Sequence, residues 1–236
     1  VFDRFVIEEQ YGWRVKEALP QCLRILDTQD LHFLRRSRED ALKAGVSWTE
    51  LGPTFRGPWR TEDVHRELAS IYRSDVALVI SSHEKGLLTD VFGVPESRLL
   101  ELGYAYPDES FSAAGEPGLA WQERAGAVWI GNFRHAPNAD AVKWLRRELW
   151  PAVQALDPRL EIRVYGAYPA REHMEMTSRE LGFIVEGPAL EASEVLSRAR
   201  VNTACLRFGA GLKGKIVEGW RAGTPAVATP VAAEGL

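Results

Sequence analysis

The sequence predicts an α/β fold built on parallel sheets, and three observations support that prediction. Strand-like apolar runs alternate with amphipathic helical patterns along most of the 236 residues. Residues 75–81 (DVALVIS) are typical of a strand buried on both faces. After residue 123 the alternation becomes regular, as in a doubly wound sheet, where ligands bind at the carboxyl ends of strands.

The first half has a helical pattern in which aromatic and aliphatic residues alternate with charges. Thr61, followed by two acidic residues, is expected to cap one of the helices. Residues 49–59, rich in Gly and Pro, are predicted to form a loop. The expected helices cover residues 5–18, 31–44, 61–74 and 82–92, and the expected strands cover residues 23–26 and 75–81.

Residues 103–122 contain Pro, Gly, Tyr and acidic residues without periodicity, and we interpret them as an interdomain linker. The predicted domains are therefore 1–102 and 123–236. Because the chain begins without methionine and ends just after a strand, we expect a fragment of a longer protein, with an incomplete N-terminal domain. In the second domain the expected strands are 127–130, 161–165, 183–186, 201–206 and 226–229, and the expected helices are 139–156, 170–181, 191–198 and 213–222.

Composition narrows the class of protein. Hydrophobic content of 45% and charged content of 26% are ordinary for a soluble globular chain. The net charge of −4 gives no reason to expect nucleic acid as a partner. Cys22 and Cys205 lie in apolar surroundings, which favours buried, reduced thiols in a cytoplasmic protein. Peripheral membrane association of the full-length protein stays open.

The most specific motif is the glycine-rich bend after the strand at 201–206. Gly209 and Gly211 lie in a turn that opens a helix, and bare N–H groups at a helix N-terminus favour phosphate. Lys213 and Lys215 add positive charge, and Glu218 is placed to accept hydrogen bonds from ribose hydroxyls. The alternative is an ordinary salt bridge between Lys215 and Glu218.

A second glycine-led turn, residues 131–138, follows the first strand of the second domain. Gly131 and Asn132 would let a diphosphate approach the backbone, and Arg134 would neutralise its charge. Asn138 is expected to cap the following helix. In the first domain His83 and Glu84 follow a buried strand, and we favour a plain helix start over a role in the site.

From Val128 to Leu236 the chain resembles the nucleotide-sugar-binding half of retaining glycosyltransferases of family 4, the group 1 class. The matching segments are WIGNFRH with Pro137-Asn138, and FGAGLKGK with Glu218, followed by AGTP and ATP. The resemblance implies the GT-B fold, in which two Rossmann-like domains face each other across a cleft. It extends more weakly to residues 26–32 and 74–84 of the first domain.

The chain departs from the family pattern at two positions. The family's donor motif has two glutamates; Glu218 matches the second, but Ala210 stands at the first. The family's active-site histidine aligns with Gln29, and His32 follows three residues later. His32 either faces the cleft or is a plain helix residue.

The resemblance implies transfer of a sugar from a UDP- or GDP-sugar donor to a hydroxyl of a glycan or other acceptor, with retained configuration, in the synthesis of a cell-surface polysaccharide or glycoconjugate. We expect Arg134, Lys213 and His32 to be catalytic, the charged groups stabilising the departing diphosphate. No cofactor or divalent metal is expected, and the sequence has no Asp-x-Asp motif. The alternatives are a non-catalytic nucleotide-sugar-binding or assembly module and a nucleotide-sugar 2-epimerase on the same fold.

Overall fold

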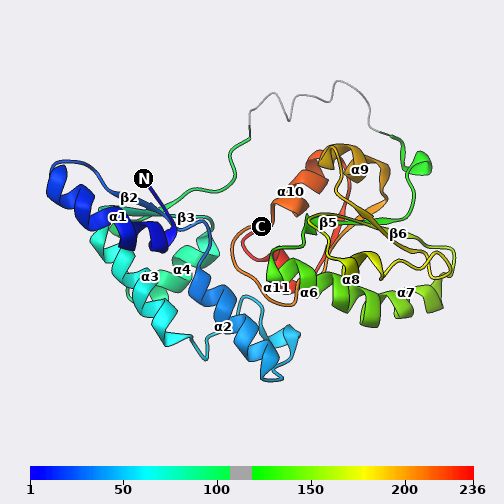
Figure 1. Cartoon of the computed structure of the whole chain (residues 1–236), viewed down its shortest axis with the longest axis horizontal. Coiled ribbons are helices and arrows are strands. Elements are labelled where there is room, and N and C mark those ends of the chain that lie inside the picture. Colours follow the sequence, from blue (N-terminus) through cyan, green and yellow to red (C-terminus); the bar gives the residue numbers. More distant parts are fainter. Residues whose placement is uncertain (107–118) are drawn as a thin grey trace. The chain divides into compact units, whose positions relative to one another are not determined.

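The computed structural model describes residues 1–106 and 119–236, so most of the expected linker lies outside the described residues. The chain divides into two compact units, whose segments can be located in Figure 1 by the sequence colours. Unit 1 comprises residues 1–105 together with 208–212 and 233–236, and unit 2 comprises the described parts of 106–207 and 213–232. The glycine bend therefore clusters with unit 1, although it lies between strands of unit 2 in the sequence.

Unit 1 is a parallel sheet in the order β1-β2-β3-β4, flanked by helices, with no reversal of strand order. The register pairs Leu26 with Ala77, and Ala77 with Leu99, so the apolar side chains of the central strands share one core. The elements are β1 (Phe2–Asp3), α1 (Arg4–Ala18), β2 (Ile25–Asp27), α2 (His32–Lys43), α3 (Thr61–Arg73), β3 (Val76–Val79), α4 (Ser82–Asp90) and β4 (Leu99–Glu101).

Unit 2 is a parallel sheet in the order β7-β6-β5-β8-β9. In Figure 1 its strands lie between α6 and α7 on one side and α9 and α10 on the other, as in a doubly wound fold. The elements are β5 (Ala127–Asn132), α6 (Ala136–Trp144), α7 (Trp150–Leu156), β6 (Ile162–Ala167), α8 (Arg171–Met174), β7 (Phe183–Gly187), α9 (Ala192–Arg198), β8 (Val201–Ala204), α10 (Gly214–Arg221), β9 (Ala226–Ala228) and α11 (Pro230–Ala233).

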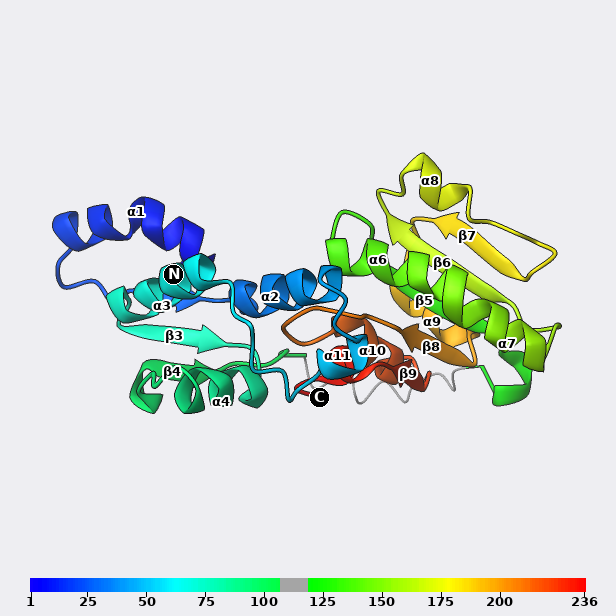
Figure 2. The same ribbon diagram turned by 90° about the horizontal axis from the view of Figure 1, so that it is seen from below.

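The core of unit 2 forms on the side of the sheet covered by α6 and α7. Trp129, Phe133, Val164 and Phe183 are buried there with Trp150 from α7. A π-helical turn, Leu145–Leu149, joins α6 to α7, and Figure 2 shows the two helices as one continuous rod. The long helix expected over 139–156 is therefore present, but it begins three residues earlier.

Several local expectations were wrong. His135, not Asn138, is the N-cap of α6, and the Asn138 amide instead donates to the Asn132 carbonyl at 3.0 Å. Thr61 is the first residue of α3 and makes no capping hydrogen bond, because Arg60 is the N-cap. Cys22 is exposed, whereas Cys205 is buried as expected.

The helix expected over 170–181 is a single turn, α8. Its continuation is prevented by the chain's return toward β7: Ser178 pairs with Phe183 in an isolated bridge, and the Thr177 hydroxyl accepts a hydrogen bond from the Val185 N–H. Gly182, at a φ of +57°, makes the reversal that this return requires.

Among residues 1–106 and 119–236, no helix has the length and apolarity needed to cross a bilayer.

Candidate functional site

The strand order of unit 2 reverses at β5, which has β6 on one side and β8 on the other. In open parallel sheets this switch point leaves a crevice at the carboxyl ends of the strands, where ligands bind. The carboxyl end of β5 is Gly131–Asn132, and β8 leads toward the first turn of α10. The topology therefore brings the turn at 131–138 and the first turn of α10 to one edge of the sheet.

Lys215 joins the two motifs. Its ammonium Nζ lies 2.9 Å from Oδ1 of Asn138, on α6, and 4.3 Å from the centroid of the Trp129 ring, on β5. A side chain on Gly131 would not fit beside it, since a Cβ there would lie 3.0 Å from Lys215 Nζ and 2.7 Å from the Trp129 ring. Gly131 thus lets the ammonium approach the backbone at the end of β5.

The salt bridge between Lys215 and Glu218 does not form, although both residues belong to the described part of the chain. Burial lowers the pKa of the Lys215 ammonium to about 7, and the charge of Lys213 acts in the same direction. Cys205 and Glu218 oppose the shift, Glu218 through its charge at longer range. Burial also raises the pKa of the Cys205 thiol to about 11, so this cysteine is a core residue and not a nucleophile.

Arg134 follows β5 and is exposed; its guanidinium stacks 3.6 Å from the ring centroid of Tyr168, which follows β6. The Asn132 side chain accepts a hydrogen bond from the Arg134 N–H at 2.9 Å and so fixes the turn. The cation is therefore held at the switch-point edge by the Tyr168 ring and is exposed there. Tyr168 was missed from the sequence, where its only signal is its place after Gly166 at the end of a predicted strand.

Lys213 is 9% exposed. It is the N-cap residue of α10 and therefore lies immediately before the helical turn that carries Lys215. Glu218 lies one turn further along α10 and is partly buried. Unit 2 thus gathers Gly131, Asn132, Arg134, Lys213 and Lys215 at neighbouring strand ends, with Glu218 on the same helix.

The glycine bend, 208–212, is not the open cradle that the sequence suggested. Gly209 and Gly211 are buried in unit 1. The Gly211 N–H donates to Oε1 of Glu84 at 2.6 Å, and the Gly209 carbonyl accepts from the fully buried Arg38 at 2.8 Å. Gly211 has a φ of +69°, and a Cβ there would lie 2.9 Å from Cβ of Asp30. The bend does bind an anion, but that anion is the carboxylate of Glu84, for which the sequence favoured a plain helix start.

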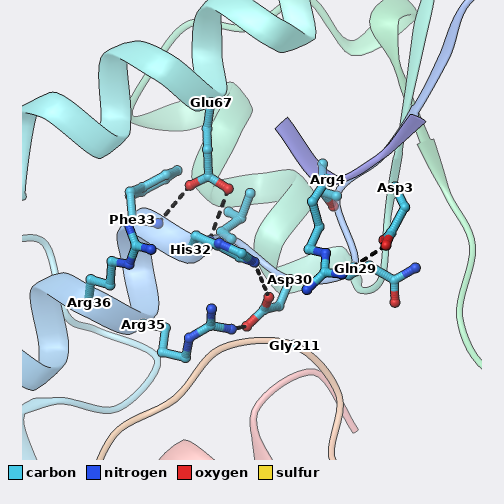
Figure 3. Close-up of polar contacts among 12 residues, drawn as sticks. Asp3, Arg4, Gln29, Asp30, His32, Phe33, Arg35, Arg36, Glu67 and Gly211 are labelled. Atoms are coloured by element: carbon cyan, nitrogen blue, oxygen red, sulfur yellow. Dashed lines mark hydrogen bonds and ion pairs between the residues drawn. The ribbon is translucent and has the colours of Figure 1, made fainter. Parts of the chain in front are cut away.

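His32 is the first residue of α2 and is buried, with Nε2 at 3.3 Å from Oδ1 of Asp30 (Figure 3). Burial alone would raise the pKa of the Asp30 carboxyl, but the hydrogen bond from His32 and the charge of Arg35 hold it below its usual value. The loop that carries Gly211 passes beside Asp30 in Figure 3. A carboxylate that orients an imidazole is a common arrangement for proton transfer.

Glu67, from α3, holds the start of α2 in place. Its two carboxylate oxygens accept the N–H groups of His32 at 3.0 Å and Phe33 at 2.6 Å (Figure 3). Burial raises the pKa of Glu67 to about 8 against these two hydrogen bonds. Sequence patterns missed this interaction because it joins residues on different helices.

Among the described residues, no group of three or more His, Cys, Asp or Glu side chains is arranged to hold a metal ion.

Comparison with known structures identifies the fold. The chain has 14% identity and a TM-score of 0.59 with the pneumococcal O-GlcNAc transferase GtfA, solved with UDP and GlcNAc, over 92% of this chain and 39% of that one. Anabaena Alr3699/HepE, solved with UDP and glucose, gives 10% identity and a TM-score of 0.57 over 95% and 56%. WaaG, a glycosyltransferase involved in lipopolysaccharide biosynthesis, gives 14% and 0.53 over 95% and 64%. The fold is that of the GT-B glycosyltransferases.

A family model also matches the second half of the chain: residues 124–236 match the model of "Glycosyl transferases group 1". No curated protein matches the chain. The chain spans from 39% to 64% of the length of the three solved structures. The matched region contains every candidate residue of unit 2.

Proposed function

We propose that the chain transfers a sugar from a nucleotide-diphosphate donor to an acceptor hydroxyl, with retention of configuration and without a metal ion, in the synthesis of a cell-surface glycan in the cytoplasm. The proposal is supported by the position of Arg134 directly after β5 and of Lys213 and Lys215 at the start of α10, because β5 and β8 are neighbours at the switch point of unit 2. The relatives solved with UDP share this fold and support a UDP-sugar as donor.

In the proposed reaction the acceptor oxygen bonds to the anomeric carbon as the bond from that carbon to the diphosphate oxygen breaks. The electron pair leaves with the nucleoside diphosphate, so negative charge develops on its phosphate. Cations fixed before the reaction stabilise that charge without reorganisation, which is usually the largest contribution to catalysis. Arg134 and Lys213 would meet the phosphates, and Glu218 would accept hydrogen bonds from the ribose.

On the acceptor side we propose His32 as the group that contacts the acceptor hydroxyl, with Asp30 orienting its ring. Their hydrogen-bonded arrangement in unit 1 supports this role. The Gly211 N–H already donates to Glu84. We therefore propose that the phosphates contact residues of unit 2, and that Gly209 and Gly211 only shape the bend.

The test is to incubate the chain with UDP-, GDP- and dTDP-sugars and follow release of free nucleotide, while titration calorimetry follows binding. Lys213→Ala should weaken nucleotide binding by about 1.5–3 kcal/mol if charge-assisted hydrogen bonds are lost. Lys16→Ala, on the exposed face of α1, is the matched control and should bind as the wild type does. Binding without turnover would favour the non-catalytic module, and absence of binding to all three donor classes would overturn the proposal.

A further inference from the structure

Tyr168 has a backbone conformation that residues with a side chain rarely adopt. Its φ is +58°, in the left-handed region that favours glycine. Among the described residues, Arg4 and Gln29 are the other non-glycine residues with a positive φ, and all three lie within two residues of the carboxyl end of a parallel strand. Strained residues persist only where the surrounding structure holds them, and they cluster at functional sites. The conformation of Tyr168, at the end of β6, is therefore to be explained by its contacts.

The contact that this conformation provides is with Arg134. Cζ of the Arg134 guanidinium lies 3.6 Å from the centroid of the Tyr168 ring. Tyr168 is 57% exposed, so packing in the core does not account for its strained backbone. Within residues 1–106 and 119–236 its phenol hydroxyl makes no hydrogen bond. The side chain thus acts through its ring, which attracts the cation to its face.

The turn that carries Tyr168 is fixed to the turn after β5. The Phe133 N–H donates to the Ala167 carbonyl at 3.1 Å, immediately before Tyr168. The Phe133 ring fills the space beside Gly166, where a Cβ would lie 2.4 Å from it. On α8 the His173 ring stacks on the same Phe133 ring, with 4.3 Å between centroids. Because Phe133 contacts residues on both sides of Tyr168, the backbone between them is held in its strained form.

We propose that Tyr168 is a positioning residue for the nucleotide-diphosphate donor, and that its strained backbone places the ring that holds the Arg134 guanidinium at the end of β5. The inference rests on the proposed function. Tyr168 acts through Arg134 and does not itself contact the donor. Without the ring the guanidinium is free to move, and fixing it again when the diphosphate binds reduces the affinity.

The experiment is a double-mutant cycle, in which calorimetric titration of the full chain with UDP-glucose compares the wild type, Tyr168→Ala, Arg134→Ala and the double variant. Tyr168→Ala should weaken binding by about 2- to 10-fold, which corresponds to ordering one long side chain. In the Arg134→Ala background the same change should have less than about a twofold effect. Arg134→Lys is a second background: it keeps the charge but not the planar group that stacks, so the effect of Tyr168→Ala should again be smaller than in the wild type.

Two further variants separate the ring from other causes. Tyr168→Phe keeps the ring and should bind UDP-glucose within about twofold of the wild type. Tyr72→Ala is the matched control, since Tyr72 is an exposed tyrosine whose ring lies 5.5 Å from the guanidinium of Arg98 in unit 1, and its loss should leave binding unchanged.

Urea unfolding tests the strain itself. Tyr168→Gly should have a higher urea midpoint than Tyr168→Ala, because glycine adopts a positive φ without steric cost. At position 72, inside α3, the order should be the reverse, because glycine is the poorer helix former. A lower midpoint for Tyr168→Gly than for Tyr168→Ala would contradict the strained backbone.

The outcomes separate this inference from the proposed function. Wild-type affinity in Tyr168→Ala, or an equal loss of affinity with and without Arg134, would overturn the positioning role and leave the proposed function standing. Failure of the wild type to bind UDP-glucose, GDP-mannose or dTDP-glucose would overturn both.

Discussion

At the scale of single residues, the chemistry of unit 2 depends on groups that change one another's properties. Lys215, Asn138 and Gly131 form one arrangement: the glycine makes room for the ammonium, and the amide ties that ammonium to the β5 turn. The role of each of these three residues depends on the other two. Lys215 is more than a mobile surface cation, because its surroundings disfavour the charge that its expected role requires.

This burial predicts how pH affects stability. The pKa of Lys215 is about 7 in the folded chain, below the usual value of 10.5 for a lysine side chain in water. Between these values the unfolded state holds a proton that the folded state lacks, so stability rises with pH in that window; below about pH 7 the full penalty remains. Lys215→Met should therefore be more stable than the wild type below pH 7, and this advantage should shrink by up to about 1.4 kcal/mol per pH unit above it.

Urea unfolding at pH 6, 7.5 and 9 measures this difference. Lys16→Met, in which an exposed lysine is removed, serves as the control and should show no such trend. A constant difference between Lys215→Met and the wild type across the three pH values would contradict the burial of the amine.

At the scale of elements, α2 depends on a residue of another helix for its start. Leu31, its N-cap residue, provides no side-chain acceptor, and Glu67 of α3 takes two of the first N–H groups instead. Because His32 is the first residue of α2, Glu67 also fixes the histidine that we propose for the acceptor side.

The raised pKa of Glu67 gives this contact its own pH dependence. The folded-state pKa of about 8 exceeds the usual pKa of 4.5 for a glutamate side chain, so the contribution of Glu67 to stability is full below about pH 4.5 and is lost as the pH rises to about 8. Glu67→Gln cannot titrate, and its stability relative to the wild type should increase between pH 5 and pH 8. Thermal unfolding at these two pH values tests this, with the exposed Glu50→Gln as control. Parallel behaviour of Glu67→Gln and the wild type would show that Glu67 stays ionised throughout.

Elements also show what the sequence could and could not predict. The strands expected at 127–130 and 183–186 are present as β5 (Ala127–Asn132) and β7 (Phe183–Gly187), because apolar runs bounded by glycine or polar residues are a local signal. The helix expected after β6 shortened to α8 because tertiary pairing of Ser178 with Phe183 overrode a helical pattern. The switch-point residues Gly131 and Lys215 were identified from their motifs, but Tyr168, Glu67 and the Glu84–Gly211 hydrogen bond depend on contacts between distant residues.

At the scale of the whole molecule, the division into units does not follow the sequence boundary. The glycine bend and the C-terminal residues 233–236 both cluster with unit 1, where the fully buried Arg38 joins them. Arg38 donates to the Gly209 carbonyl and, at 2.9 Å, to Oε1 of Glu234. His83 lies 3.2 Å from the same carboxylate. These contacts attach late segments of the chain to an early helix.

A buried ion pair of this kind is stabilising only while both partners are present. Arg38→Met should destabilise unit 1 by about 3–5 kcal/mol, because Glu234 is left buried beside fewer donors. Adding Glu234→Gln should cost less than the sum of the single changes, with a coupling of about 1–3 kcal/mol. A double-mutant cycle in urea measures this coupling. Strictly additive effects would show that the two residues act independently and that the C-terminal segment is held by other contacts.

The central claim, that a nucleotide diphosphate binds at the carboxyl ends of β5 and β8 in unit 2, is tested most directly by amide chemical-shift mapping of the full chain with UDP-glucose. The account predicts that the largest shifts fall on residues 131–134 and 213–215. Unit 2 also has a cavity at the opposite, amino-terminal end of its strands, lined by Ala127, Glu161 and Arg200 among others. Shifts concentrated around that cavity, or none at millimolar UDP-glucose, would contradict the claim.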